Sequence, residues 1–321
     1  MFAARGLAVS FSISVLLYSA LSLAVCAVWR SAWIYCQRYP ARRCANLLFI
    51  LRLIPFALAT GVTLALALPS FLLLEPRAVD EPLGALPVIL GLCGLAVVLA
   101  GLRSATVALL AASRTVALWS RETHVVDAGL KDSRDSVPVL GVSAAGPPLT
   151  AAGILRPSVW LSRVAEFVLT ERELQSALRH EFVHVRRRDN LRKLILRLVA
   201  FPGMAELESA WREATEMAAD DGAVSSASEA LDLAAAVIKL SRLAPLKSAA
   251  ELTTALVHSP AESVNARVER LLAWTEPRQS AAREYSWAYL LTAAAAVVVT
   301  LALTYSELLV RVHAATEWLV R

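Results

Sequence analysis

Long apolar runs fill the first third of the chain and return near its end. They cover residues 7–29, 47–74 and 83–105, and a fourth covers 286–305. Each is close to or above the roughly 20 residues with which an α-helix crosses the hydrocarbon core of a bilayer. None shows the periodic polar face of a surface helix, and the first lacks an evident signal-peptide cleavage site. The pattern therefore predicts four transmembrane helices rather than buried core helices.

The stretch from 113 to 285 has the mixed composition of a soluble domain. Alternating apolar positions at 137–142 and 154–161 predict two short strands. From Thr170 onward the apolar positions recur at helical spacing. They predict a helix from Thr170, continuing over 190–200, then helices at 204–222, 227–243, 252–257 and one starting at Ser259-Pro260, with Ser259 as its cap.

The charged residues indicate how the chain is oriented in the membrane. The loop after the first span carries four arginines and no acid, whereas the loop after the second contains both signs. Basic residues concentrate in cytoplasmic loops, so 113–285 is predicted to be cytoplasmic and the N-terminus and tail 306–321 extracytoplasmic. This gives a membrane domain at 1–112, a cytoplasmic domain at 113–285, a fourth span at 286–305 and a short tail.

The overall composition agrees with a membrane protein. Hydrophobic residues make up 57% of the chain, charged residues 18%, and the mean hydropathy is +0.56, which is too apolar for an ordinary soluble enzyme. The net charge of +5 is explained by topology and an anionic inner leaflet, and no direct nucleic-acid binding is expected. The cysteines Cys26, Cys36, Cys44 and Cys93 lie in or beside spans without paired spacing, so we expect neither a disulfide nor a thiolate metal site.

The cytoplasmic domain contains the motif H-E-x-x-H at His180, Glu181 and His184. On a helix, residues four apart point nearly the same way, so both imidazoles can bind one zinc ion. Glu181 lies a quarter turn away, where it can act as a general base on a water at the metal. Thr170 and Glu173 form a capping box that starts the required helix upstream.

A catalytic zinc site needs a third protein ligand. Glu213, Glu216 and Asp220 share one face of a later predicted helix. We predict that Glu216 is the third ligand and that Asp220 accepts the second ring N–H of a ligand histidine. An exposed acidic helix paired with arginines 186–188 is the alternative.

With these motifs in place, the chain resembles the BlaR/MecR-type antirepressor membrane zinc metallopeptidases. The resemblance rests on HEFVHVRRRDNL, the E-x-x-x-D at Glu216 and Asp220, and the preceding GILRPSVWLS, and it spans nearly the whole chain. It implies a zincin-like α+β metallopeptidase domain between helices three and four of a bacterial-type inner (cytoplasmic) membrane protein. It also implies Zn²⁺ on His180, His184 and Glu216, and a strand that binds extended substrate by edge pairing. The residues of that strand are Pro157, Ser158, Val159, Trp160 and Leu161.

The chain also departs from the family pattern. Members that sense β-lactams carry a penicillin-binding domain after the fourth span, whereas here only about fifteen residues follow and no S-x-x-K motif occurs. We therefore expect that domain to be absent and do not expect β-lactam sensing. Ala219 replaces the family's cysteine beside the supporting aspartate.

The function expected from these features is zinc-dependent cleavage of a cytoplasmic or membrane-proximal protein, with a DNA-binding repressor as the first substrate to test. The rival is a non-proteolytic signal transducer that acts through a partner. The substrate and the oligomeric state, a homodimer included, stay open.

Four further residues are assigned by residue type and position. His124 and His258 are candidates by residue type for stabilising an oxyanion. Asp189 is expected to cap the following helix or to pair with Arg186 or Arg192, and His313 is expected to have no partner.

Overall fold

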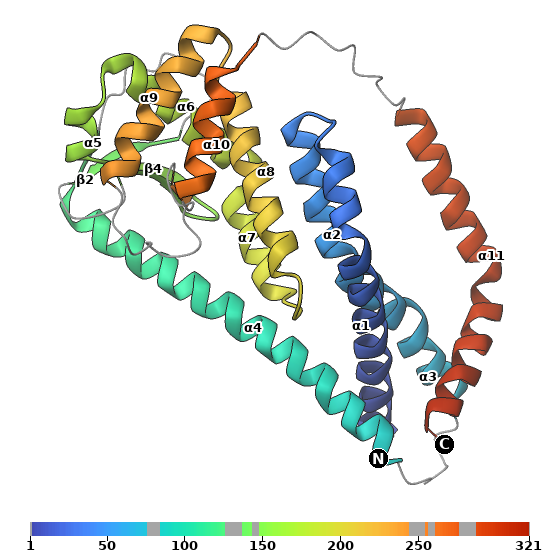
Figure 1. Ribbon diagram of the computed structural model, residues 1–321. Helices are drawn as coiled ribbons and strands as arrows, with labels where there is room; N and C mark the ends of the chain where they lie inside the picture. Colours follow the sequence, from blue (N-terminus) through green and yellow to red (C-terminus); the bar gives the residue numbers. More distant parts are fainter. Residues whose placement is uncertain are drawn as a thin grey trace. The chain divides into compact units, whose positions relative to one another are not determined.

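The computed structural model describes residues 2–75, 84–125, 137–142, 148–243, 254–255, 261–275 and 287–320 (Figure 1). It is mostly helical with one small sheet. Its contacts divide it into two compact units. One comprises Met1–Ala27, Leu53–Ala100 and Pro277–Arg321, and the other comprises Val28–Arg52 and Gly101–Glu276.

Three helical segments are long and apolar enough to cross a membrane: Phe2–Cys36, Ala41–Leu74 and Ala85–Trp119. The first is helix α1 and the last is α4. The middle one consists of α2 (Ala41–Val62), a π-helical turn η1 (Thr63–Ala67) and α3 (Leu68–Leu74). These three predicted spans are confirmed as candidates, and each helix is longer than its apolar run. The predicted fourth span falls in α11 (Trp287–Val320) and stays a prediction.

In the first unit, the contact of α4 with α1 depends on Gly94, and the contact of α11 with the middle helix depends on Pro69. A side chain at Gly94 would come within 2.5 Å of the Phe11 carbonyl oxygen, so this glycine lets α4 approach α1 closely. Pro69 has no N–H to donate to the carbonyl of Ala65, four residues earlier. The Tyr305 hydroxyl of α11 donates to that oxygen at 2.8 Å. The contact joins α11 to the middle helix.

The second unit contains a five-stranded sheet in the order β1-β2-β4-β3-β5. The pair β2 and β4 is parallel and the other neighbours are antiparallel. The strand bounds are β1 Thr123–Val125, β2 Val139–Val142, β3 Leu149–Ala152, β4 Ser158–Ser162 and β5 Thr254–Ala255.

Six helices of the second unit follow the strand β4 along the chain, and Figure 1 colours them from yellow-green to orange-red. They are α5 Arg163–Val168, α6 Glu171–Arg187, α7 Asp189–Leu198, α8 Ala205–Ala223, α9 Ala227–Leu243 and α10 Ala261–Leu272. Strand residues such as Val159 and Leu161 share one core with Leu178 of α6 and Leu233 of α9. The apolar stripe of α6 is therefore buried between the sheet and α9, and its histidines are fixed by this packing.

One local prediction is confirmed and one is corrected. Thr170 Oγ1 accepts from the Glu173 amide and the Glu173 carboxylate accepts from the Thr170 amide, which is the predicted capping box. Helix α6 ends at Arg187, its C-cap Arg188 is a non-glycine residue in the left-handed conformation (φ 54°), and α7 starts directly after that cap. The predicted continuation of the motif helix is thus a separate helix with a turn between.

Other predictions are wrong. The strand expected at 154–161 begins only at Ser158, because Gly153 (φ 98°) turns the chain and Pro157 cannot donate to a strand ladder. Strands β1 and β3 were not predicted, and Thr254–Ala255 is a strand where a helix was expected. Ser259 and Pro260 lie outside the described residues, and the helix that they were expected to start begins at Ala261.

The expectation of no disulfide is also wrong. Cys36 at the end of α1 and Cys44 in the first turn of α2 form a disulfide, with their Cα atoms 5.0 Å apart. The helical hairpin brings them together because the two helices are joined by only four residues, 37–40. Cys26 and Cys93 do not take part in a disulfide within the described part of the chain.

Candidate metal centre

Helix α6 places His180, Glu181 and His184 in the interior of the second unit. Their exposed fractions are 0%, 0% and 1%. The two Nε2 atoms of the histidines lie 3.1 Å apart, which is the juxtaposition that the i, i+4 spacing predicts.

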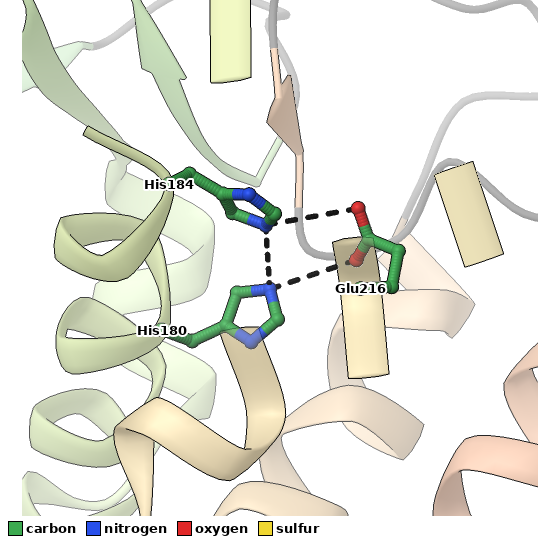
Figure 2. Close-up of side chains that lie close together, drawn as sticks. All are labelled: His180, His184 and Glu216. Carbon is green, nitrogen blue, oxygen red and sulfur yellow. Dashed lines mark hydrogen bonds and ion pairs between the residues drawn. The ribbon is translucent and has the colours of Figure 1, made fainter. Parts of the chain in front are cut away.

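Helix α8 brings Glu216 to the two imidazoles (Figure 2). One of its carboxylate oxygens lies 3.6 Å from His180 Nε2 and the other lies 3.7 Å from His184 Nε2. The close approach of α8 to α6 depends on Gly222, where a Cβ would lie 2.9 Å from Val183. Glu216 is only 16% exposed, whereas Glu213 on the same helix is exposed. The alternative of a wholly exposed acidic helix is therefore wrong.

Two buried aspartates hold the far sides of the imidazole rings. His180 Nδ1 lies 2.9 Å from Asp220 Oδ1, and His184 Nδ1 lies 2.8 Å from Asp189 Oδ2. Both aspartates are fully buried. A carboxylate facing Nδ1 favours the tautomer with the proton on Nδ1, which leaves the lone pair on Nε2.

This arrangement can hold a metal ion. Two Nε2 lone pairs and a carboxylate converge on one point, so the group repels itself unless a cation lies among them. Ligand atoms on a tetrahedral zinc ion, each about 2.0 to 2.2 Å from the metal, are roughly 3.4 Å apart. The two Nε2 atoms are 3.1 Å apart, and each lies 3.6 or 3.7 Å from a different oxygen of the Glu216 carboxylate, which is close to this value. The three residues fit a metal such as zinc.

The pKa of His180 indicates that its surroundings favour a positive charge. Burial lowers its pKa, but hydrogen bonds to Asp220 and Glu216 outweigh burial and raise the pKa to about 9. A proton thus takes the position that a metal would otherwise fill. Metal binding must displace that proton, so metal affinity depends on pH.

Arg267 of α10 joins the carboxylates of the site. It is 2% exposed and donates to both oxygens of Asp220, from Nε at 2.9 Å and from a terminal nitrogen at 2.6 Å. Its other terminal nitrogen lies 3.1 Å from Glu216. Burial raises the pKa of Glu216, but His184 and Arg267 outweigh it and lower the pKa to about 2. The pKa of Asp220 is likewise held well below its usual range, burial being outweighed by Arg267 and His180.

Glu181 is set apart from this network. Its Oε2 accepts a hydrogen bond from the Ala151 amide of β3 at 2.8 Å. Its Oε1 is buried without a hydrogen-bond partner among the described residues. Burial raises the pKa of Glu181, although the neighbouring histidines lower it. Thus the sheet positions Oε2 of Glu181, and Oε1 is available to accept or donate a proton.

The predicted substrate strand needs correction. Ser158, Val159, Trp160 and Leu161 belong to β4, which is paired on one side with β2 and on the other with β3. Pro157 immediately precedes it. The strand is therefore interior and has no free edge for a peptide. The strand that contacts Glu181 is β3, and β3 is already paired with β5 at Thr150 and Ala151.

The sequence analysis missed two residues of the site. Asp189 was expected to cap α7 or to pair with Arg186 or Arg192. It makes no capping bond, and its ion pair with Arg192 at 3.9 Å is confirmed. Its contact with His184 was not predicted. Its position five residues after the motif was the available signal. Arg267 had no signal in the sequence, because its partners lie 47 and more residues away.

The remaining histidines lie elsewhere. His124 is in β1, and His258 lies outside the described residues. His313 belongs to the first unit and lies beside Glu75 and Glu317, so the expectation that it has no partner is wrong.

Comparison with known proteins adds no family assignment. Neither the protein-family models nor the curated proteins contain a match to this chain.

Proposed function

We propose that this protein is a membrane-anchored zinc-dependent endopeptidase that cleaves a cytoplasmic or membrane-proximal protein. The observation that carries the proposal is the convergence of His180, His184 and Glu216 beside a buried carboxyl group, Glu181, that is not one of the three donors. A purely structural metal site has a closed ligand set and no need of such a group. The three apolar helices support attachment to a membrane.

His180, His184 and Glu216 would hold the metal. When bound, zinc supplies Lewis-acid chemistry, in which it polarises a carbonyl and lowers the pKa of a water ligand towards about 7. Asp220 and Asp189 hold the imidazoles in the tautomer that presents Nε2. Arg267 keeps Glu216 and Asp220 ionised and in place.

Glu181 is the general base and acid in this proposal. Its free Oε1 would take a proton from the attacking water and later give it to the leaving amine. Burial raises its pKa, which moves the carboxyl group toward the range where it can both accept and donate near neutral pH. The hydrogen bond from Ala151 fixes the other oxygen.

A substrate has to bind beside these residues. Since β4 is interior, an extended peptide would pair with an edge strand or take the place of Thr254–Ala255 on β3. The resemblance to antirepressor peptidases makes a DNA-binding repressor the first substrate to test.

The test uses the full chain in detergent micelles and in cells. Glu181→Gln should keep one zinc at this site and lose cleavage, because the amide cannot accept the water's proton. Glu171→Gln is the matched control, an exposed glutamate on the same helix, and should behave like the parent. Comparing new protein termini in cells that express each form identifies the substrate, and unchanged cleavage with Glu181→Gln refutes the role given to Glu181.

The same comparison separates the rival function. A non-proteolytic transducer would produce the same protein termini in parent, Glu181→Gln and His180→Ala, while a downstream response is lost only with His180→Ala. A protease loses both with either variant.

A further inference from the structure

A second group of His and Glu side chains of the kind that ligate metals lies in the other unit. Glu75 follows the end of α3, and His313 and Glu317 lie four residues apart on α11. His313 Nε2 lies 3.9 Å from Glu75 Oε2 and 3.5 Å from Glu317 Oε1. One donor atom from each residue lies within 4.8 Å of the other two. The i, i+4 spacing puts His313 and Glu317 on one helical face, as it does His180 and His184.

The distances favour a bridging ion over direct hydrogen bonds. Nitrogen-to-oxygen hydrogen bonds are about 2.7 to 3.2 Å long, so both contacts of His313 are longer than ordinary bonds. Donor atoms that share a tetrahedral ion lie roughly 3.4 Å apart. In addition, His313 Nδ1 is buried and has no hydrogen-bond partner among the described residues. The imidazole of His313 therefore lies between the carboxylates of Glu75 and Glu317 at distances longer than hydrogen bonds.

The local charge also favours a cation. Two carboxylates face the imidazole of His313, and Arg5 lies 3.1 Å from Glu75 Oε1. Arg5 contacts the oxygen of Glu75 opposite to the one that faces His313. The other oxygen of Glu75 is therefore the one directed at the imidazole.

We propose that Glu75, His313 and Glu317 form a second site for a divalent transition-metal cation of the zinc type. One imidazole and two carboxylates suit zinc and its neighbours better than magnesium or calcium, which prefer all-oxygen sites. The ion links α11 to the end of α3, two segments also joined by the Tyr305 hydrogen bond. Because Glu317 is 46% exposed, the ion exchanges with the surrounding solution.

The predicted topology places this second site on the extracytoplasmic side of the membrane. Residues 5, 75, 313 and 317 all belong to segments predicted to be extracytoplasmic, opposite to the domain that holds His180 and His184. The second site would thus respond to metal outside the cell. It does not depend on the proposed peptidase activity.

The experiment counts zinc in the full chain. Protein in micelles is stripped with a chelator, loaded with Zn²⁺, passed through gel filtration and analysed for bound metal. The parent should hold about two ions. His313→Ala and Glu317→Gln should each hold one. Glu307→Gln, which removes an exposed carboxylate from the same helix, should hold two.

Variants at the two sites keep the two proposals distinguishable. His180→Ala should also hold one ion, and the double variant His180→Ala/His313→Ala none. If only the second site exists, the parent holds one ion, which His313→Ala removes and His180→Ala does not. Equal zinc in the parent and in His313→Ala overturns the second site. Saturation by Mg²⁺ as readily as by Zn²⁺ overturns its assignment to a transition metal. Circular dichroism and the gel-filtration profile verify that each variant is folded.

Discussion

Replacing Arg267 by methionine should strongly destabilise the metal-free protein. Arg267 is 2% exposed, and its partners Asp220 and Glu216 are 0% and 16% exposed. Methionine fills a similar volume but leaves two buried carboxylates without their counter-charge. Removing one partner of a buried ion pair costs about 3 to 5 kcal/mol. For a unit of this size, about 1 kcal/mol shifts the melting temperature by roughly 2 to 4 °C, so we expect a fall of about 10 °C.

The measurement is a thermal melt of the full chain in micelles with a chelator present. Arg267→Lys keeps the charge but loses the two-pronged contact with Asp220, so it should melt between the parent and Arg267→Met. The control is Arg172→Met at an exposed position of α6, which should shift the melt little.

A double-mutant cycle tests the cause. With Asp220→Asn the buried negative charge is gone, so the additional loss from Arg267→Met should shrink. An Arg267→Met protein that melts within about 2 °C of the parent would refute the reasoning, because the carboxylates would then not depend on this arginine.

Three further outcomes are expected. Asp189→Asn removes the carboxylate that holds His184 Nδ1 and should weaken zinc binding about 10- to 100-fold in a chelator competition; unchanged affinity would show that Asp189 does not support the ligand. For the metal-free protein, the His180 pKa of about 9 against 6.5 in the unfolded chain means that His180 contributes stability fully below pH 6.5 and loses it as the pH rises through about 9. This difference is worth about 3 kcal/mol at most, and melts of the parent against His180→Gln across that range should show it; a gap between the two that widens with pH would contradict it. If the loop between α1 and α2 is cytoplasmic as predicted, Cys36 and Cys44 should be reduced in cells and react with a maleimide in lysates made without air exposure, whereas protection until a reductant is added would place the loop on the oxidising side.

Local sequence determined the parts of this protein that depend on neighbours along the chain. The apolar runs predicted three helices long enough to span a membrane because helix length and hydropathy are local properties. The capping box at Thr170 and Glu173 and the shared face of His180 and His184 follow from helical geometry alone.

Only the tertiary structure decided which distant groups meet. It brought Arg267 from another helix to the carboxylates of Glu216 and Asp220, and it brought Asp189 to His184. It made β4 an interior strand, because short strands such as β3 and β5 carry little sequence signal and gain their stability from partners far along the chain. A helix period specifies which side chains share a face, whereas the identity of the facing element depends on packing and charge pairing across the fold. That is why the histidines and their acidic neighbours Glu216 and Asp220 could be predicted from helical spacing, whereas the contact of Asp189 with His184 and the position of Arg267 were evident only in the fold.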